Sequence, residues 1–111
     1  MDLSRLAEHI GLGEDEFREL LGIFVEVSYS DLNQLAAGIE QGDPKQVVEA
    51  AHSIKGAAIN LGLQDISEIA RGVEMSAQEH NLDESASAMD RLIERLELLD
   101  SVIKERFPSL S

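Results

Sequence analysis

The chain has 111 residues, a length that fits one domain able to bury a core without disulfides or metals. Its formal net charge of −13 argues against nucleic acid and anionic membrane surfaces as partners, because both need a basic footprint. The absence of cysteine excludes disulfides and thiolate metal sites and agrees with a cytoplasmic location. No apolar run approaches the roughly 18 residues of a membrane span, and no signal peptide is apparent.

A short helix and a long one are predicted first along the chain. The short helix covers residues 3–10 and ends at Gly11, and the long one covers residues 14–41. The long helix ends at a clear break, Gly42-Asp43-Pro44, in which Asp43 suits a helix cap and Pro44 the first helical position. Its apolar residues recur at helical spacing: Phe17, Leu21, Phe24, Leu35 and Ile39.

Three further helices are predicted over residues 44–61, 65–79 and 84–106, with Gly62 and Asn81-Leu82-Asp83 in the links. Each has one apolar stripe. The inward residues predicted for the three helices in turn are Val47, Ala50, Ala51, Ile54, Ala57, Ala58 and Leu61; Ile66, Ile69, Ala70, Val73 and Ala77; Met89, Leu92, Ile93, Leu96, Leu99 and Ile103.

These elements predict an all-α fold. Four amphipathic helices with short links are typical of an antiparallel up-down-up-down four-helix bundle. The short N-terminal helix would cap one end of it. We therefore expect a single domain over residues 1–111, with its core within about residues 14–106.

The stretch 51–56, which reads Ala-His-Ser-Ile-Lys-Gly, stands out from the helix around it. At about 100° per residue, Ile54 in the apolar stripe lies nearly opposite His52, so His52 is expected to face outward. Lys55 and Gly56 are its neighbours one turn further on. A glycine inside a helix costs about 1 kcal/mol relative to alanine, so Gly56 needs a specific reason.

These residue types suit covalent phosphoryl transfer. A neutral imidazole is a competent nucleophile, and a hydrogen bond to one ring nitrogen assigns the other to the reaction. Lys55 can pair with a phosphoryl group as a mobile cation. Gly56 removes a side chain where another protein must approach closely. Each residue alone also fits a simple surface or packing role, but their joint arrangement off the apolar stripe favours the chemical hypothesis.

The same stretch resembles the motif of the histidine-containing phosphotransfer (HPt) domain family. The resemblance is specific over residues 51–74, where His52, Lys55 and Gly56 are followed by Gly62 and a helix that contains Glu74. In length and helix order it extends over essentially the whole chain. It implies a four-helix bundle that relays phosphoryl groups in two-component signalling.

The resemblance also implies a role for each motif residue. His52 would accept the phosphoryl group through Nε2, Lys55 would assist at that group, and Gly56 would keep the approach open. Glu74 falls where chemotaxis-type domains place a glutamate hydrogen-bonded to the other ring nitrogen, which would fix the tautomer and make Nε2 more nucleophilic. Arg71 stands where those domains often carry a second histidine, which favours a relay module.

Receiver domains of response regulators or hybrid histidine kinases are the implied partners. The receiver is expected to supply Mg²⁺, and no cofactor or metal is expected in this chain. Lys45 and Arg71 could form a basic patch together with Lys55. Val48 and Ile59 are candidates for an apolar docking rim, unless neighbouring helices cover them. A monomer is expected, because the pattern shows no large exposed apolar stripe.

Three alternatives to this function were weighed against the sequence motif. Glu49 and His52 match one Glu-x-x-His unit of di-iron bundles, but those sites need two units facing the interior, so no metal site is expected. A non-catalytic receiver-docking module would not need His52, Lys55 and Gly56 together. A phosphoacceptor domain excised from a larger sensor or chemotaxis-type kinase would share the motif, although both chain ends look natural. No nucleotide-binding loop is apparent, so a phosphocarrier without kinase activity is expected.

Overall fold

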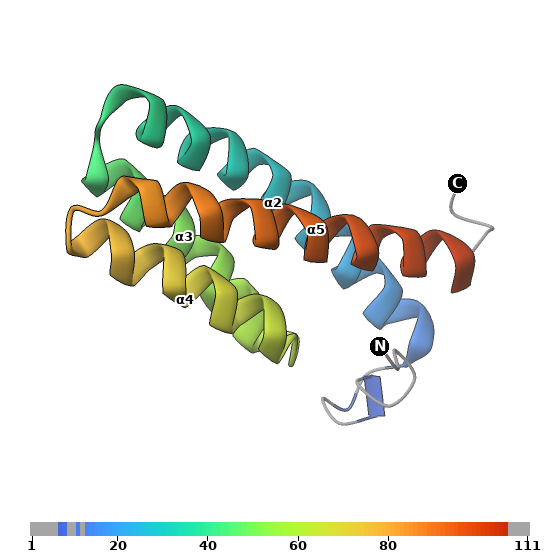
Figure 1. The fold of residues 1–111 in the computed structure, drawn as a ribbon. Helices are drawn as coiled ribbons and strands as arrows, with labels where there is room; N and C mark the ends of the chain where they lie inside the picture. The colour runs from blue at the N-terminus through green and yellow to red at the C-terminus, as the bar shows by residue number, and fades with distance from the viewer. Residues whose placement is uncertain (1–6, 9–10, 12, 107–111) are drawn as a thin grey trace.

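The computed structural model describes residues 7–8, 11 and 13–106. This part of the chain is an all-α bundle, as predicted, in which consecutive helices run in opposite directions (Figure 1). Each helix packs against the next, and α2 also packs against α5, which closes the bundle. The helices are α2 Glu14–Gln41, α3 Pro44–Asn60, α4 Gln64–Gln78 and α5 Leu82–Arg106.

The predicted N-terminal helix over residues 3–10 falls mostly outside the described residues. Ala7 and Glu8 are helical, and Ala7 is buried in the larger of the two hydrophobic clusters that form the core. The close of the last helix at Pro108 also lies outside the described residues.

The bounds predicted for the four helices of the bundle are correct within two residues, and the largest difference is at the start of α5. This helix begins at Leu82, because Asn81 caps it. The Asn81 side-chain oxygen accepts a hydrogen bond from the Glu84 N–H at 3.1 Å, and the Asn81 amide donates to the Glu84 carboxylate at 3.1 Å. The residues predicted as a turn are therefore the cap and first turn of a helix. Asn-x-x-Glu was the sequence signal for that start.

Two glycines end α2 and α3 in the left-handed conformation. Gly42 has φ 67° and Gly62 has φ 74°. Beyond them the chain returns a backbone N–H to the last helical turn, from Asp43 to the Gly38 carbonyl at 2.8 Å and from Leu63 to the Ala58 carbonyl at 2.9 Å. These tight exits reverse the chain and hold α3 beside both α2 and α4.

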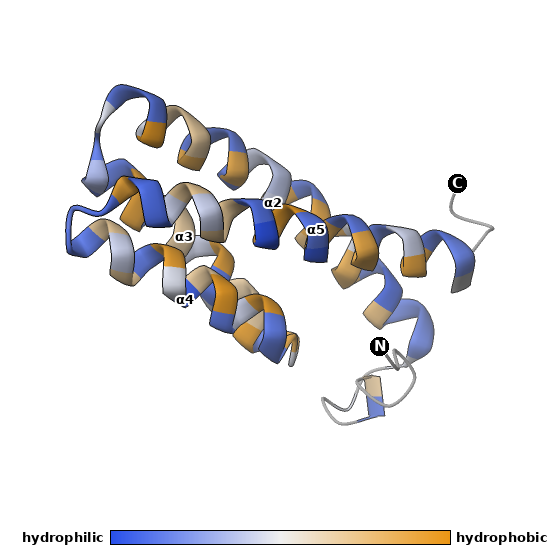
Figure 2. Cartoon of the chain, viewed as in Figure 1, coloured by the Kyte–Doolittle hydropathy of each residue, from blue (hydrophilic) through white to orange (hydrophobic). Residues whose placement is uncertain are grey.

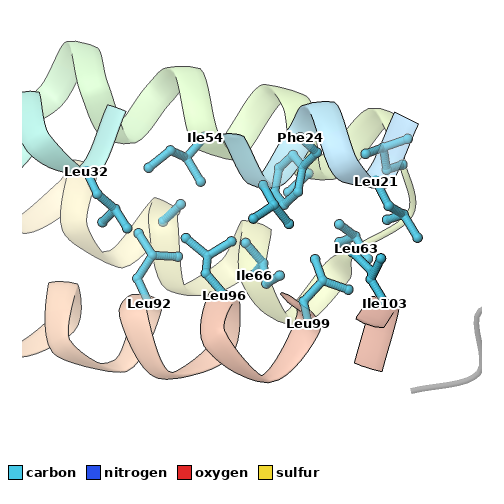
Figure 3. Close-up of a cluster of buried hydrophobic side chains, with 14 of the residues drawn as sticks. Leu21, Phe24, Leu32, Ile54, Leu63, Ile66, Leu92, Leu96, Leu99 and Ile103 are labelled. Carbon is cyan, nitrogen blue, oxygen red and sulfur yellow. The ribbon is translucent and has the colours of Figure 1, made fainter. Parts of the chain in front are cut away.

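The core consists of two clusters along the bundle axis, and α3 contributes to both. The larger cluster contains Ile54 and is drawn in Figure 3, while the smaller one contains Ala51. Figure 2 shows apolar residues on the inner sides of the helices and polar residues on much of the outer surface. The other fully or nearly fully buried members of the smaller cluster are Leu35, Val47, Ala50, Val73, Ala77 and Ala88.

Helices α2 and α3 approach closely at Gly38. A Cβ added there would lie 2.9 Å from Val47 Cγ2 and 3.1 Å from the Val47 backbone nitrogen. Gly38→Ala is therefore expected to lower the free energy of unfolding by about 1–3 kcal/mol, although alanine is the better helix former. Urea unfolding measures the change.

Gly22→Ala is the matched control in the same helix. A Cβ at Gly22 meets nothing within 4 Å. This variant is expected to gain up to about 1 kcal/mol from helix propensity alone. Equal stabilisation by the two substitutions would contradict a packing role for Gly38.

Candidate functional site

His52 projects outward from the middle of α3. Its side chain is 67% exposed, whereas Ile54 on the opposite side of the helix is fully buried. The inward positions of α3 fix this orientation, because Ala51, Ile54 and Ala58 all face the core. The outward orientation predicted from the helical period is thus present in the structure.

Glu74 on α4 meets one nitrogen of the His52 ring. Its Oε2 lies 2.7 Å from His52 Nδ1, and the glutamate is buried, with 8% of its surface exposed. An ionised carboxylate can only accept, so this contact requires the proton on Nδ1. Nε2 then has the free lone pair, in a ring that is open to solvent.

Lys55 binds the same carboxylate. Its Nζ donates to Glu74 Oε1 at 2.7 Å, and 22% of the lysine side chain is exposed. The antiparallel packing of α3 on α4 places both side chains, one turn apart on α3, against a single residue of α4. The structure therefore brings His52, Lys55 and Glu74 into one hydrogen-bonded array.

The array lowers the pKa of Glu74. Burial acts to raise the pKa of this carboxyl, but hydrogen bonds from Lys55 and His52, together with their charges, outweigh it and hold the pKa below its ordinary value of 4.5. The group thus contributes stability that is fully present above pH 4.5 and is lost as the pH falls through the lowered folded-state value.

We therefore expect Glu74→Gln to reduce the free energy of unfolding at pH 7 and to matter less in acid. Urea unfolding of both proteins between pH 7 and about pH 3 measures the gap, which should narrow as the wild-type carboxyl takes up a proton. Because the other carboxylates titrate in both proteins, the difference isolates Glu74. A gap that widens in acid would contradict the lowered pKa.

Gly56 leaves open space beside the histidine. A Cβ added there would meet no atom within 4 Å, so close helix packing does not explain this glycine. It contrasts with Gly38, where the neighbouring helix leaves no room. Because Gly56 has no side chain, nothing projects from the surface of α3 at the position one turn after His52.

The other four candidate residues occupy different surroundings. Lys45 and Arg71 are exposed, and Ile59 is 59% exposed, whereas Val48 is partly buried against the smaller core cluster. Lys45 lies two turns before His52 on α3, while the antiparallel α4 carries Arg71 on the Gly56 side. Of the three cations, Lys55 is engaged by Glu74, and the basic patch that would join it to Lys45 and Arg71 stays a prediction.

An apolar groove lies between α2 and α3 and was not predicted from the sequence. Leu20, Ile23 and Val27 on α2 are 40%, 56% and 47% exposed. With Phe24 on α2, Ala57 and Asn60 on α3, and Leu61 directly after α3, they line a groove of about 430 Å³. The expectation of no large exposed apolar stripe was wrong. The sequence did contain a signal for this groove. The helical spacing of these three residues makes the apolar face of α2 wider than the part that packs in the core.

A second missed contact lies directly beside the histidine. The Ser53 hydroxyl donates to Asp31 Oδ2 at 2.7 Å, which joins α3 to α2. On its other side α3 is joined to α4 through Glu74. The turn that carries His52 is therefore tied to both neighbouring helices.

The described part of the chain shows neither a metal-binding cluster nor a membrane-spanning helix. No group of three or more histidine, cysteine, aspartate or glutamate side chains there is arranged to hold a metal ion. Among the same residues, no helix has both the length and the apolar character needed to cross a membrane.

Comparison with known proteins agrees with the geometry. A search of curated proteins returned no match. The chain is similar in structure to histidine-containing phosphotransfer protein B (HptB) from Pseudomonas aeruginosa PAO1, with a TM-score of 0.83 and 26% sequence identity over 96% of this chain and 92% of that one. The sequence model of the Hpt domain matches residues 19–102. The chain belongs to the Hpt domain family, whose members carry phosphoryl groups on histidine in two-component signalling.

Proposed function

We propose that this protein is a phosphorelay intermediate in which His52 accepts a phosphoryl group and passes it on. The donor is the phosphoaspartate of a receiver domain, or a kinase, and the acceptor is an aspartate on a response-regulator receiver. The observation that carries this proposal is the exposed His52 ring whose Nδ1 contacts the buried Glu74 carboxylate at 2.7 Å. This arrangement leaves Nε2 free to attack.

The transfer needs no oxidant and no further reactant. The lone pair of Nε2 attacks phosphorus as the bond from phosphorus to the aspartyl oxygen breaks, and that electron pair stays on the aspartate carboxylate. The proton on Nδ1 stays in place, held by Glu74. The reverse steps, with a second receiver, return a neutral imidazole. Mg²⁺ on the receiver would neutralise phosphoryl charge, while this chain contributes mainly the positioning of one ring.

The α2–α3 groove supports docking of a receiver domain. Ala57 in the groove directly follows Gly56, and Asn60 lies about one turn further along α3, so the groove runs along the part of α3 that follows the histidine. A receiver that docks over His52 and extends across α3 to α2 would also cover Leu20, Ile23 and Val27, which would lose their contact with water. Exposed Ile59 would extend this apolar contact on α3.

Phosphoryl transfer from a panel of phosphorylated receiver domains tests the proposal. Labelled phosphate on the protein should be labile in acid and stable in alkali, as expected of phosphohistidine. Stable receiver binding without any label would instead favour a docking module.

A further inference from the structure

Ser53 and Asp31 link α3 to α2 on one side of the histidine. The Ser53 hydroxyl donates to Asp31 Oδ2 at 2.7 Å; the serine is exposed and the aspartate partly exposed. Ser53 directly follows His52 in the chain, so this carboxylate belongs to the immediate surroundings of the histidine. Because the hydrogen bond already restricts the carboxylate, it has less rotamer freedom to lose when a partner binds.

The helical period places Gly56 on this same side of His52. At about 100° per residue, Ser53 is rotated by about 100° from His52, and Gly56 by about 40° in the same sense. Lys55 is rotated by about 60° in the opposite sense, where it contacts Glu74 on α4. The space that Gly56 leaves open is therefore on the α2 side of the histidine. A partner that uses this space approaches over the junction of α2 and α3.

The junction of α2 and α3 is apolar at one end and polar at the other. Val27 belongs to the apolar groove, and Asp31 follows it one turn later on α2. Beyond Asp31, the Gln46 side-chain amide of α3 donates to the Gln34 backbone carbonyl of α2 at 2.9 Å. Asp31 thus carries a charge at the point where the apolar surface ends. A partner that lies across the junction meets apolar groups first and a carboxylate next, which sets its direction.

The negative charge of Asp31 is available to such a partner. Within the described residues, Asp31 is held by a neutral hydroxyl and forms no ion pair. Lys45 and Glu49 lie one turn apart on the outer side of α3, so their opposite charges largely offset each other. Lys55 is engaged by Glu74.

Covering an ionised carboxylate without a counter-charge is unfavourable, because the group loses water and finds no equivalent partner. A protein with a basic side chain at this point offsets the loss, whereas one with an apolar or acidic side chain does not. We propose that Asp31 is a specificity-determining residue. It selects receiver domains that present a lysine or arginine to the polar end of the α2–α3 junction. This inference rests on the proposed function and adds to it the chemistry by which the partner of His52 is chosen.

Titration calorimetry with unphosphorylated receiver domains tests the inference. Asp31→Asn keeps the size of the side chain and an oxygen that accepts from Ser53, but it removes the charge. For the receivers that bind the wild-type protein most tightly, the Kd should rise about tenfold, and binding should depend less on salt. Receivers that bind the wild-type protein poorly should keep or gain affinity. Unchanged Kd values, or an equal loss for every receiver, would overturn the inference.

Two matched variants separate the local charge from other effects. Asp90→Asn removes the same charge from an exposed position on α5 and should bind receivers as the wild-type protein does. Ser53→Ala removes the hydrogen bond but keeps the carboxylate, so it should lose less affinity than Asp31→Asn. A loss in Asp90→Asn as large as that in Asp31→Asn would overturn the inference, because net charge would explain both. An equally large loss in Ser53→Ala would also overturn it, because Asp31 would then serve only to join the helices.

Phosphoryl transfer gives a second readout. With the receivers that Asp31 selects, Asp31→Asn should raise the KM for the phosphorylated receiver about tenfold and leave kcat unchanged, because the carboxylate acts on docking. A fall in kcat with KM unchanged would overturn the inference. The calorimetry needs no phosphate, so a wild-type protein that binds receivers but accepts no phosphate would refute the proposed function alone. Absence of binding by every receiver would overturn the inference about Asp31.

Discussion

His52→Gln is expected to abolish phosphoryl acceptance and leave the fold intact. Glutamine has no nucleophilic ring nitrogen, so no phosphorus–nitrogen bond can form. The free energy of unfolding should change by no more than about 1 kcal/mol, because the side chain is exposed and Lys55 still binds Glu74. Transfer of labelled phosphate from a receiver domain, together with urea unfolding, measures both effects.

His80→Gln is the control for this experiment. His80 is exposed in the link between α4 and α5, outside the array around Glu74. This variant should accept phosphate as the wild-type protein does. Persistent labelling of the His52 variant, or loss of labelling in the His80 variant, would place the phosphoacceptor elsewhere.

Gly56→Gln is expected to separate folding from transfer. A Cβ at this position meets no atom within 4 Å, and glutamine is a better helix former than glycine, so the free energy of unfolding should stay level or rise by up to about 1 kcal/mol. The transfer rate should fall roughly 100-fold, because the side chain stands where the phosphorylated partner must approach and displaces the reacting groups. Gly56→Ala, which adds only a methyl group, should slow transfer less. Stopped reactions with one phosphorylated receiver measure these rates.

Gly72→Gln is the matched control. Gly72 is also a mid-helix glycine with nothing within 4 Å of an added Cβ, but it lies in the cleft between α4 and α5. Its substitution should give a similar gain in stability at the wild-type transfer rate. Equal transfer rates for the two glutamine variants would show that Gly56 does not clear the approach.

The fold and the outward orientation of His52 could be predicted because each depends on one helix at a time. The helical period that buries Ile54 also turns His52 outward, whatever lies beside the helix. Gly42 and Gly62 ended their helices where predicted, since left-handed exits depend mainly on local sequence. The start of α5 was missed because Asn81 was interpreted as part of a turn and not as a cap.

Contacts between helices were harder to predict. The spacing on α3 places Lys55 near His52 but does not show that both share Glu74, because this depends on how α4 is rotated and displaced against α3. The exposed stripe at Leu20, Ile23 and Val27 has a similar cause. Some apolar residues of α2 are buried in the core and others line the groove beside α3. Both kinds follow the same helical spacing, so only the packing of the helices shows which of them stay in contact with water.

Helix α3 contributes to both core clusters, and this affects how much conformational entropy the chain loses when a receiver domain binds. Ala51 and Ile54, on either side of His52 in the chain, belong to different clusters. Local unfolding of the helical turn that carries His52 must therefore disrupt both clusters. The backbone freedom of this turn is therefore lost when the chain folds and not when a receiver arrives. The partner meets an imidazole that is already oriented, and its binding free energy can go into bringing phosphorus to Nε2.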